Sequence, residues 1–405
     1  MKKDTQLKFL VLCLVPFIMV LGNSMLIPVL PSMKSELKIT QLEVGLLITV
    51  FSFPAGIVIP FAGVLSDHIG RKAIITPALI IYGIGGLIAG FAAMLLKEPY
   101  YIILIGRIIQ GIGAGGTYQL AMALTGDIFK SSERVKALGY LEASNGLGKV
   151  VSPLLGAAIG LISWYAPFFV YGVMSIPIAF AVWFVVKEPK ESLKRQSYME
   201  YKTSLKEVYE EKAVPLATCF FAGMISLFVL FGMLSYYSDL LESSFKIDGF
   251  LKGIIIAGPV FAMAVLSFSL GIFLENNDKY MKSFIISGLV LIVLGQVLFA
   301  IFSSFWMLFI AVVLIGAGVG GVLPPVNTFI TSAVSTKRRG VVTCLYGTVR
   351  FFGVAIGPPL YSYIEDLGKV LPLAFSSGFV VLSLILVIIF ITAQFAEDKK
   401  EAEGS

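Results

Sequence analysis

The stretch "GVLSDHIGRK", residues 63–72, decides the fold because it is a short polar turn between two long apolar windows. Each flanking window is long enough to cross a bilayer as a helix. Gly63 and Gly70 let the backbone turn tightly, and Asp67 stands where a carboxylate meets the positive end of the second helix. Arg71 can then pair with acids at the membrane surface. The stretch therefore predicts a helical hairpin whose two arms lie in the membrane.

Apolar windows of this kind recur along the whole chain. Of its 405 residues, 57% are hydrophobic and only 14% are charged, whereas soluble domains carry about 25% charged residues. The sequence therefore predicts an all-α polytopic membrane protein with twelve transmembrane helices. The expected spans are 8–30, 43–65, 73–95, 101–126, 136–160, 165–187, 213–237, 250–273, 283–302, 305–333, 340–364 and 370–394.

A long polar stretch at 188–212 divides these windows six and six. We expect residues 1–187 to form an N-terminal six-helix bundle and residues 213–396 to form a C-terminal one. The stretch between them is then a cytoplasmic linker, either a plain loop or a surface helix around 198–209. Residues 397–405 are expected to be a cytoplasmic tail.

The two halves also repeat each other in sequence. "GIGAGG" at 111–116 recurs as "GAGVGG" at 316–321, and Gly148 and Pro153 recur as Gly353 and Pro358. The turn at 63–72 has a degenerate copy at 271–280. Landmarks in the same order predict two pseudo-symmetric bundles, an arrangement in which membrane carriers place the substrate near the bilayer midplane.

Basic residues set the expected orientation. Most of the 31 lysines and arginines fall on one side of the predicted spans, and the positive-inside rule then places both termini in the cytoplasm. The net charge of +6 therefore reflects topology rather than a nucleic-acid surface. The sequence contains no phosphate loop, zinc pattern or nucleophile motif, and its three cysteines stand singly in apolar windows. We expect neither an enzyme nor a cofactor, and a bacterial cytoplasmic membrane as the location.

Four charged residues fall inside the predicted spans and away from their ends: Glu142, Arg107, Lys149 and Arg350. Such residues cost about 2.5–3.5 kcal/mol each on insertion scales, and they usually face a partner or an aqueous cavity. Glu142, Asn145 and Lys149 share one helix face. Glu142 is the only acid that no loop or interface accommodates, which makes it the candidate proton carrier; snorkelling to the interface is the alternative.

Several of these segments resemble one transporter family. Residues 21–31, 63–72, 107–113 and 148–156 are similar to the signatures of helix 1, the helix 2–3 loop, helix 4 and helix 5 in the major facilitator superfamily, in its twelve-helix drug:proton antiporter branch. The match departs from the pattern at His68, where an arginine is common, and at Ser152, which replaces a glycine.

The resemblance implies a transporter that needs no cofactor and uses the proton gradient as its energy source, acting as a monomer on small molecules and protons in a lipid bilayer. It implies roles for three groups of residues. Those implied for a cytoplasmic gate are Gly63, Asp67, Gly70, Arg71, Lys72 and Asp127. Arg107 is implied in proton coupling and, with Glu142, makes up the predicted proton-coupling residues. The residues expected at the substrate cavity are Asn23, Gln110, Gln119, Asn145, Lys149, Asn327, Arg350, Phe231 and Tyr236.

The helix 5 motif has a packing interpretation as well. Gly148, Ser152 and Gly156 recur every fourth residue and would allow close helix contact, while Pro153 would bend the helix. The implied function is proton-coupled efflux of amphiphilic drug-like compounds or metabolites by alternating access, as in multidrug resistance. Because Lys149, Arg350 and Arg107 make the interior positive, a dedicated exporter of an anionic metabolite, siderophore or lipid is the alternative. A nutrient importer or a non-transporting membrane sensor fits less well.

Overall fold

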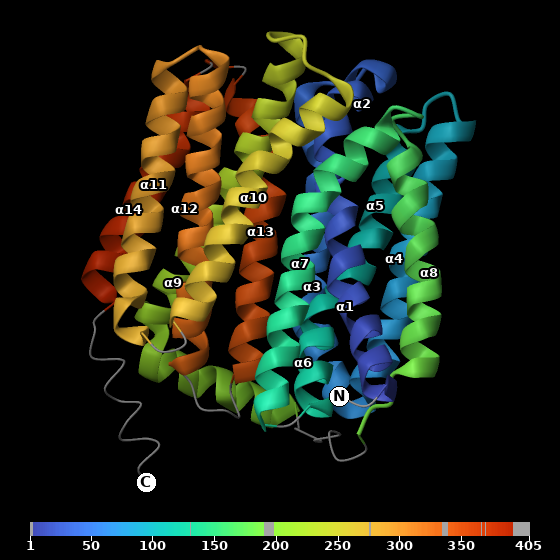
Figure 1. Cartoon of the computed structure of the whole chain (residues 1–405), viewed down its shortest axis with the longest axis vertical. Coiled ribbons are helices and arrows are strands. Elements are labelled where there is room, and N and C mark those ends of the chain that lie inside the picture. Colours follow the sequence, from blue (N-terminus) through green and yellow to red (C-terminus); the bar gives the residue numbers. More distant parts are fainter. Residues whose placement is uncertain are drawn as a thin grey trace. The chain divides into compact units, whose positions relative to one another are not determined.

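The structure is a computed structural model that describes residues 3–129, 131–189, 198–274, 277–333, 339–365, 367–368 and 370–391. Side chains are described for these residues except 3–6, 131–136, 198–212, 278 and 339. The helices are α1 Lys3–Ser24, η1 Ile27–Val29, α2 Leu30–Leu37, α3 Gln41–Ile69, α4 Arg71–Leu95, α5 Tyr100–Gly115, α6 Tyr118–Ile128, α7 Ser131–Gly160, α8 Ala166–Val185, α9 Tyr198–Ser243, α10 Gly249–Leu274, η3 Asp278–Tyr280, α11 Met281–Ile301, α12 Phe305–Ser332, α13 Arg339–Glu365 and α14 Leu371–Phe390 (Figure 1).

The predicted all-α membrane fold is confirmed. Ten helices within the described residues are long and apolar enough to cross a membrane. The two other predicted spans are also helical: α5 and α6 cover the window at 101–126, and α7 covers the window at 136–160. Because α7 contains Glu142 and Lys149, it is less apolar than its neighbours. With these two windows, the ten apolar helices make up the predicted twelve spans.

The fourth span is interrupted between α5 and α6. Gly116 and Thr117 leave the helical conformation there, and the Thr117 hydroxyl donates a hydrogen bond of 2.6 Å to the Ala114 carbonyl. The same carbonyl also accepts a backbone hydrogen bond of 3.2 Å from the Thr117 N–H, so Thr117 fixes the end of α5 through both its side chain and its backbone. The sequence window showed one continuous apolar run and therefore did not predict the interruption.

The repeated glycines make repeated contacts. A Cβ at Gly111 would collide with the Phe51 carbonyl of α3, and a Cβ at Gly316 would collide with the Pro259 carbonyl of α10. Only glycine lets two helix backbones approach this closely. The resemblance of the two halves in sequence is therefore a resemblance in helix packing.

The chain forms two compact units. Unit 1 consists of Met1–Tyr201 with Tyr237–Ala257, and unit 2 consists of Lys202–Tyr236 with Gly258–Ser405. The end of α9 and the beginning of α10 thus belong to unit 1. The backbone is helical from Tyr198 to Ser243 without a break, so the surface helix considered at 198–209 is the first part of α9. Residues 190–197 of the predicted linker, and the predicted tail 397–405, lie outside the described residues.

Candidate functional site

Arg107 of α5 lies at the centre of a closed polar cluster in unit 1. Its side chain is completely buried, although it carries a charge inside a membrane-spanning bundle. Four neutral oxygens accept hydrogen bonds from its guanidinium: the carbonyls of Leu47 and Gly22 at 3.0 and 2.6 Å, Asn23 Oδ1 at 2.6 Å and Gln110 Oε1 at 2.7 Å. Arg107 thereby connects α5 with α1 and α3.

Neighbouring side chains extend this cluster. Asn23 donates a hydrogen bond of 2.9 Å to the Ser52 hydroxyl, and Tyr82 donates one of 2.8 Å to the Ile18 carbonyl. The Phe51 ring lies 4.4 Å from the Arg107 guanidinium carbon, a distance at which the ring face attracts a cation. Within the described residues, these partners of Arg107 are therefore neutral dipoles and a ring rather than a carboxylate. Asn23 and Gln110, predicted at a substrate cavity, are buried within this cluster.

Glu142 lies on α7 with its side chain exposed. The Tyr118 hydroxyl of α6 donates a hydrogen bond of 2.5 Å to Glu142 Oε1. A hydroxyl and a carboxylate in contact form a pair through which a proton can be received and passed on. The sequence indicated a carboxylate deep in a span, whereas the structure leaves the Glu142 side chain exposed on α7.

The other residues of the α7 face differ in burial. Asn145 is buried, whereas Lys149 is half-buried further along the helix. Gln119, next to Tyr118 on α6, is half-buried as well. Carboxylate, amide and amine groups therefore lie on the adjoining helices α6 and α7 of one unit.

Three of the predicted gate residues, Asp67, Arg71 and Asp127, come together near the turn between α3 and α4. The expected place of Asp67 at the positive end of the second helix was wrong, because α3 continues through Gly63 and Asp67 to Ile69 and the chain turns only at Gly70. Arg71 Nε lies 2.6 Å from Asp127 Oδ2 at the end of α6, and an Arg71 terminal nitrogen lies 3.4 Å from Asp67 Oδ1. All three side chains are partly exposed. The sequence predicted this contact on the resemblance alone, and the structure forms it within unit 1. Its role as a gate stays a prediction.

Glu188, which follows α8, is a member of this cluster that the sequence did not reveal. Its two carboxylate oxygens accept hydrogen bonds from the backbone N–H groups of Arg71 and Lys72 at 2.8 and 3.1 Å. It therefore caps the start of α4, where Gly70 offers no side chain and adopts φ +103°. An acid in a loop carries no spacing signal, so only the three-dimensional structure identifies it. Lys72 Nζ lies 5.0 Å from the Trp183 ring centroid.

The helix 5 motif packs α7 against α1. A Cβ at Gly148 would approach the Phe17 carbonyl to 3.3 Å, and one at Gly156 would collide with the Met25 carbonyl. The Ser152 hydroxyl donates to the Gly148 carbonyl at 2.6 Å, so serine fits where the resembling pattern has glycine. Pro153 is buried within the helix. These contacts support the packing interpretation of the motif.

The predicted cavity residues of unit 2 are dispersed. Tyr236 is buried with its ring centroid 5.8 Å from that of Phe299, and Phe231 is half-buried. The half-buried Arg350 has its guanidinium carbon 5.4 Å from the Tyr346 ring centroid, while Asn327 on α12 is exposed. Their place at a substrate site stays a prediction.

Unit 2 has a polar cluster of its own. Gln296 of α11 donates hydrogen bonds to Ser376 and Tyr361 at 2.5 and 3.2 Å, and Tyr361 donates to Ser376 at 2.7 Å. Ser377 donates to Gln296 Oε1 at 3.0 Å. Every member is uncharged, and the three central side chains are buried. A lone glutamine in an apolar window was a visible signal for this cluster, and the sequence analysis did not use it.

A comparison with known families agrees with the helix count, the glycine contacts and the ion pairs at residues 63–72. The sequence profile of the Major Facilitator Superfamily matches residues 12–358 and, in a second overlapping match, 219–404. The chain belongs to the Major Facilitator Superfamily. It is a multi-pass membrane transporter, as its family and structural neighbours are, and not an enzyme.

Relatives in this superfamily resemble the chain over nearly its whole length. The bacillibactin exporter of Bacillus subtilis (strain 168) is 37% identical over 388 residues, covering 95% of this chain and 96% of the relative. The quinolone resistance protein NorA of Staphylococcus aureus (strain MRSA252) is 26% identical over 385 residues, with 92% and 94% covered.

A solved structure confirms the superfamily fold. A bacterial homologue of the human lysosomal transporter Spinster, crystallised in an inward-facing and occupied conformation, superposes with a TM-score of 0.73 at 17% identity. The superposition covers 99% of this chain and 98% of that one. At this identity the likeness shows the fold alone.

Proposed function

We propose that this protein exports a small anionic molecule of the siderophore class from a bacterial cell in exchange for protons. The observation that carries the proposal is the 37% identity to a bacillibactin exporter across 95% of the chain. The relationship covers both six-helix halves and is closer than the 26% identity to a quinolone resistance protein.

The charges of the two units support an anionic substrate. Unit 1 holds the half-buried Lys149 on α7, and unit 2 holds the half-buried Arg350 on α13. Cations within spans are costly and usually serve a substrate or ion pathway. Glu142, which accepts a hydrogen bond from Tyr118, provides a carboxylate that binds a proton in one phase of the transport cycle and releases it in the other. The basic-residue bias supports an orientation with the α3–α4 turn and both termini in the cytoplasm and the chain in the cytoplasmic membrane.

Transport by the reconstituted protein tests the proposal. Proteoliposomes are loaded with bacillibactin, a pH difference of either sign is imposed, and the release of bacillibactin is measured against protein-free liposomes. We expect release to accelerate when the outside is more acidic than the inside, because inward proton flow then drives outward movement of the substrate. We expect release to fall several-fold in Lys149→Gln. Lys38→Gln, which neutralises an exposed lysine at the end of α2, is the matched control and should transport normally. Release equal to that of protein-free liposomes would overturn the proposal.

A second candidate substrate class is lipophilic drugs, favoured by the similarity to the quinolone resistance protein over 92% of the chain. The same liposomes loaded with a quinolone distinguish the two. Quinolone release that survives Lys149→Gln, together with no bacillibactin release, would make this chain a drug exporter whose lysine is structural.

A further inference from the structure

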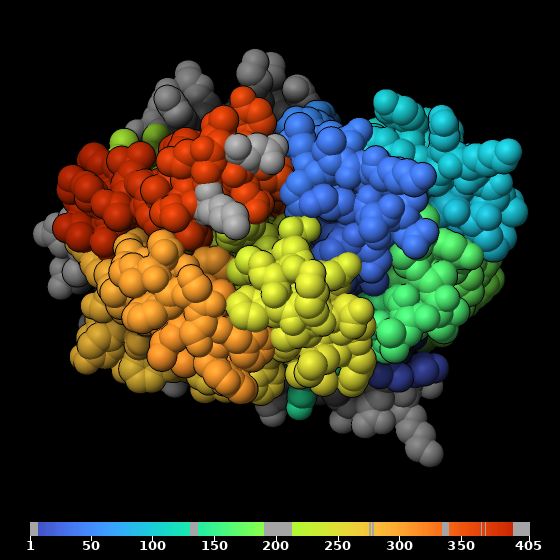
Figure 2. Space-filling model, turned by 90° about the horizontal axis from the view of Figure 1, so that it is seen from above, coloured from blue at the N-terminus to red at the C-terminus, as the bar shows by residue number. Residues whose placement is uncertain are grey.

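The end of unit 1 opposite the α3–α4 turn carries a second charged cluster. Helix α3 separates the two ends by its 29 residues, a length of about 43 Å at about 1.5 Å per residue. At this end, α2 and the end of α9 lie together with the beginning of α10. In the view onto this face, the α9–α10 connection lies beside the segments that follow α1 and α7 (Figure 2).

Residues 237–257 are seated on unit 1 by close contacts. The buried Ser238 hydroxyl donates a hydrogen bond of 3.0 Å to the Ile27 carbonyl. A Cβ at Gly253 would lie 2.9 Å from the Pro153 carbonyl of α7, and one at Gly249 would lie 3.0 Å from the Leu161 side chain. The segment is thus packed tightly, yet it is covalently part of helices that continue into unit 2.

Two ion pairs at this end have different environments. Lys252 Nζ of α10 lies 2.5 Å from Glu242 Oε2 of α9, with 2% and 34% of the two side chains exposed. Lys34 Nζ of α2 lies 3.4 Å from Asp239 Oδ1 of α9, with 37% and 22% of the two side chains exposed. The first pair joins α9 to α10, and the second joins α2 to α9. Separating the first pair would leave the buried Lys252 charge without a partner, whereas the second pair is longer, both of its side chains are partly exposed, and water can replace the contact.

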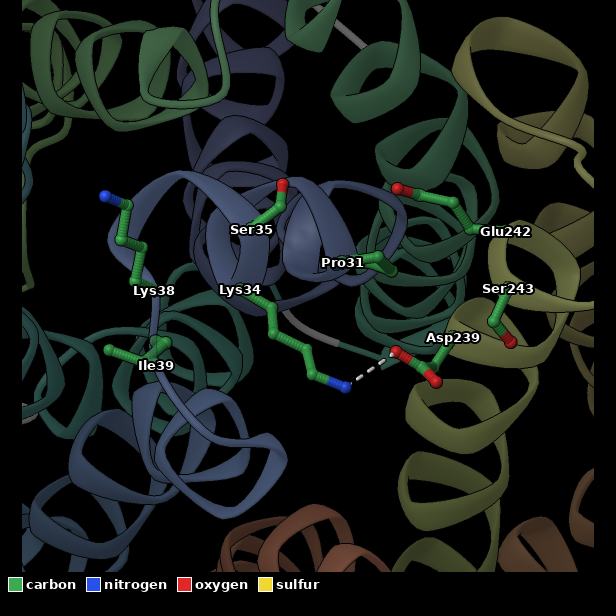
Figure 3. A pocket seen from close by; sticks show the side chains of 8 residues that line it. All are labelled: Pro31, Lys34, Ser35, Lys38, Ile39, Asp239, Glu242 and Ser243. Atoms are coloured by element: carbon green, nitrogen blue, oxygen red, sulfur yellow. Dashed lines mark hydrogen bonds and ion pairs between the residues drawn. The ribbon is translucent and has the colours of Figure 1, made fainter.

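Water has a route to the second pair. A cavity of about 380 Å³ lies between α2 and the end of α9, lined among others by Lys34, Ser35, Lys38, Asp239, Glu242 and Ser243. Figure 3 shows the Lys34 and Asp239 side chains pointing toward each other across this cavity, with Lys38 directed away. Hydration of the separated charges therefore requires no rearrangement of the surrounding helices.

We propose that Lys34 and Asp239 form a releasable clasp that holds residues 237–257 on α2, and that the shorter Lys252–Glu242 pair, whose lysine is buried, makes this segment move as one rigid hairpin. Breaking the clasp frees the α9–α10 hairpin from unit 1 and opens this end of the protein. The inference rests on the proposed transport cycle for its purpose, but the contact and its release are measurable without substrate.

Accessibility of a cysteine beneath the clasp tests the proposal. In the full-length chain with Cys13, Cys219 and Cys344 replaced by alanine, Ser238→Cys places a thiol at a buried position next to Asp239. Its labelling by a membrane-impermeant maleimide is followed on intact cells. We expect Lys34→Asp and Asp239→Lys each to accelerate labelling about two- to fivefold, the range that an exposed ion pair supports. The double variant, in which the charges are exchanged, should restore slow labelling.

Two controls separate release from misfolding. Lys38→Asp makes the same charge change in the same cavity one helical turn away, and it should leave labelling slow. A thiol at the exposed Ser243 should label rapidly in every variant. Equal labelling of Cys-substituted Ser238 in all variants, or a charge exchange that fails to restore it, would overturn the clasp. A chain that shows the clasp but moves neither bacillibactin nor quinolone would instead contradict the proposed function alone.

Discussion

Units 1 and 2 use the same helix contact for different chemistry. In α5 of unit 1, Gly111 lies against the α3 backbone, and Arg107 lies one turn before it. In α12 of unit 2, Gly316 makes the equivalent contact with α10, but Val312 occupies the position one turn before it, fully buried. The repeat preserved the glycines that let helices approach and did not preserve the charge.

The difference distinguishes residues that the helix packing requires, such as the glycines, from residues that it does not require, such as Arg107. A buried valine fills space without electrostatic cost, whereas a buried guanidinium has to be solvated by neighbouring dipoles. Unit 2 shows that this helix pair packs well without a cation. The cost of Arg107 in unit 1 is therefore not required by the architecture, and we infer that it is maintained for transport.

The largest effect is expected when Arg107→Met in unit 1 is compared with Val312→Ala at the equivalent position of unit 2. Loss of the guanidinium leaves up to four buried oxygens without a donor, each costing about 1–3 kcal/mol, and we expect transport to fall to background. Val312→Ala removes two methylene equivalents, about 1.6 kcal/mol, and should lower the unfolding temperature while the transport rate per folded molecule persists. Transport in proteoliposomes and thermal unfolding in detergent measure both effects. Equal loss of transport in the two variants would contradict the division into fold and function.

The next largest effect is expected at Glu142. Its counterpart in the unit 2 repeat is Gly347, so of the two repeats unit 1 alone carries a carboxylate at this position. Glu142→Gln keeps the hydrogen bond from Tyr118 but cannot release a proton, and we expect pH-driven transport to fall about 10²-fold. Exchange of substrate across liposomes without a pH gradient should continue. Tyr118→Phe is the milder companion, and a pH-driven rate unchanged in Glu142→Gln would exclude Glu142 as the proton carrier.

A smaller and symmetric effect is expected at the shared glycines. Gly111→Ala and Gly316→Ala each place a methyl group against a backbone carbonyl of the facing helix, and overpacking of this kind costs about 1–3 kcal/mol. We expect similar losses of thermal stability in the two variants. Gly378→Ala on α14, where a Cβ meets nothing within 4 Å, is the matched control and should not lower stability. A loss in one repeat only would mean that the helix pairs are not equivalent.

The sequence determined those parts of the fold that depend on periodicity and repetition. Apolar windows predicted the spans, and the glycine repeat predicted two related bundles. The interruption at Gly116–Thr117 was not predictable, because an apolar run does not reveal a local change of backbone angles. The assignment of residues 237–257 to unit 1 was hidden as well, since it depends on contacts between residues far apart in the chain.

For the candidate site, residue type identified members but not partners. A charge in an apolar window singled out Arg107 and Glu142, because such residues are rare in lipid. The sequence did not show that Arg107 binds four neutral oxygens or that Tyr118 meets Glu142. Glu188 was missed because its partners are backbone N–H groups, which every residue except proline possesses.

The smallest effect is expected in the neutral cluster of unit 2. Tyr361→Phe removes a hydroxyl that contacts Gln296 and Ser376 while keeping the ring, whose centroid lies 5.7 Å from that of Phe228. We expect a loss of about 0.5–1.5 kcal/mol in the free energy of unfolding, since one net hydrogen bond is worth that much. Transport per folded molecule and its pH dependence should not change. A pH profile shifted by Tyr361→Phe would show that this cluster takes part in proton transfer, and the contrast between the charged cluster of unit 1 and the neutral cluster of unit 2 would then fail.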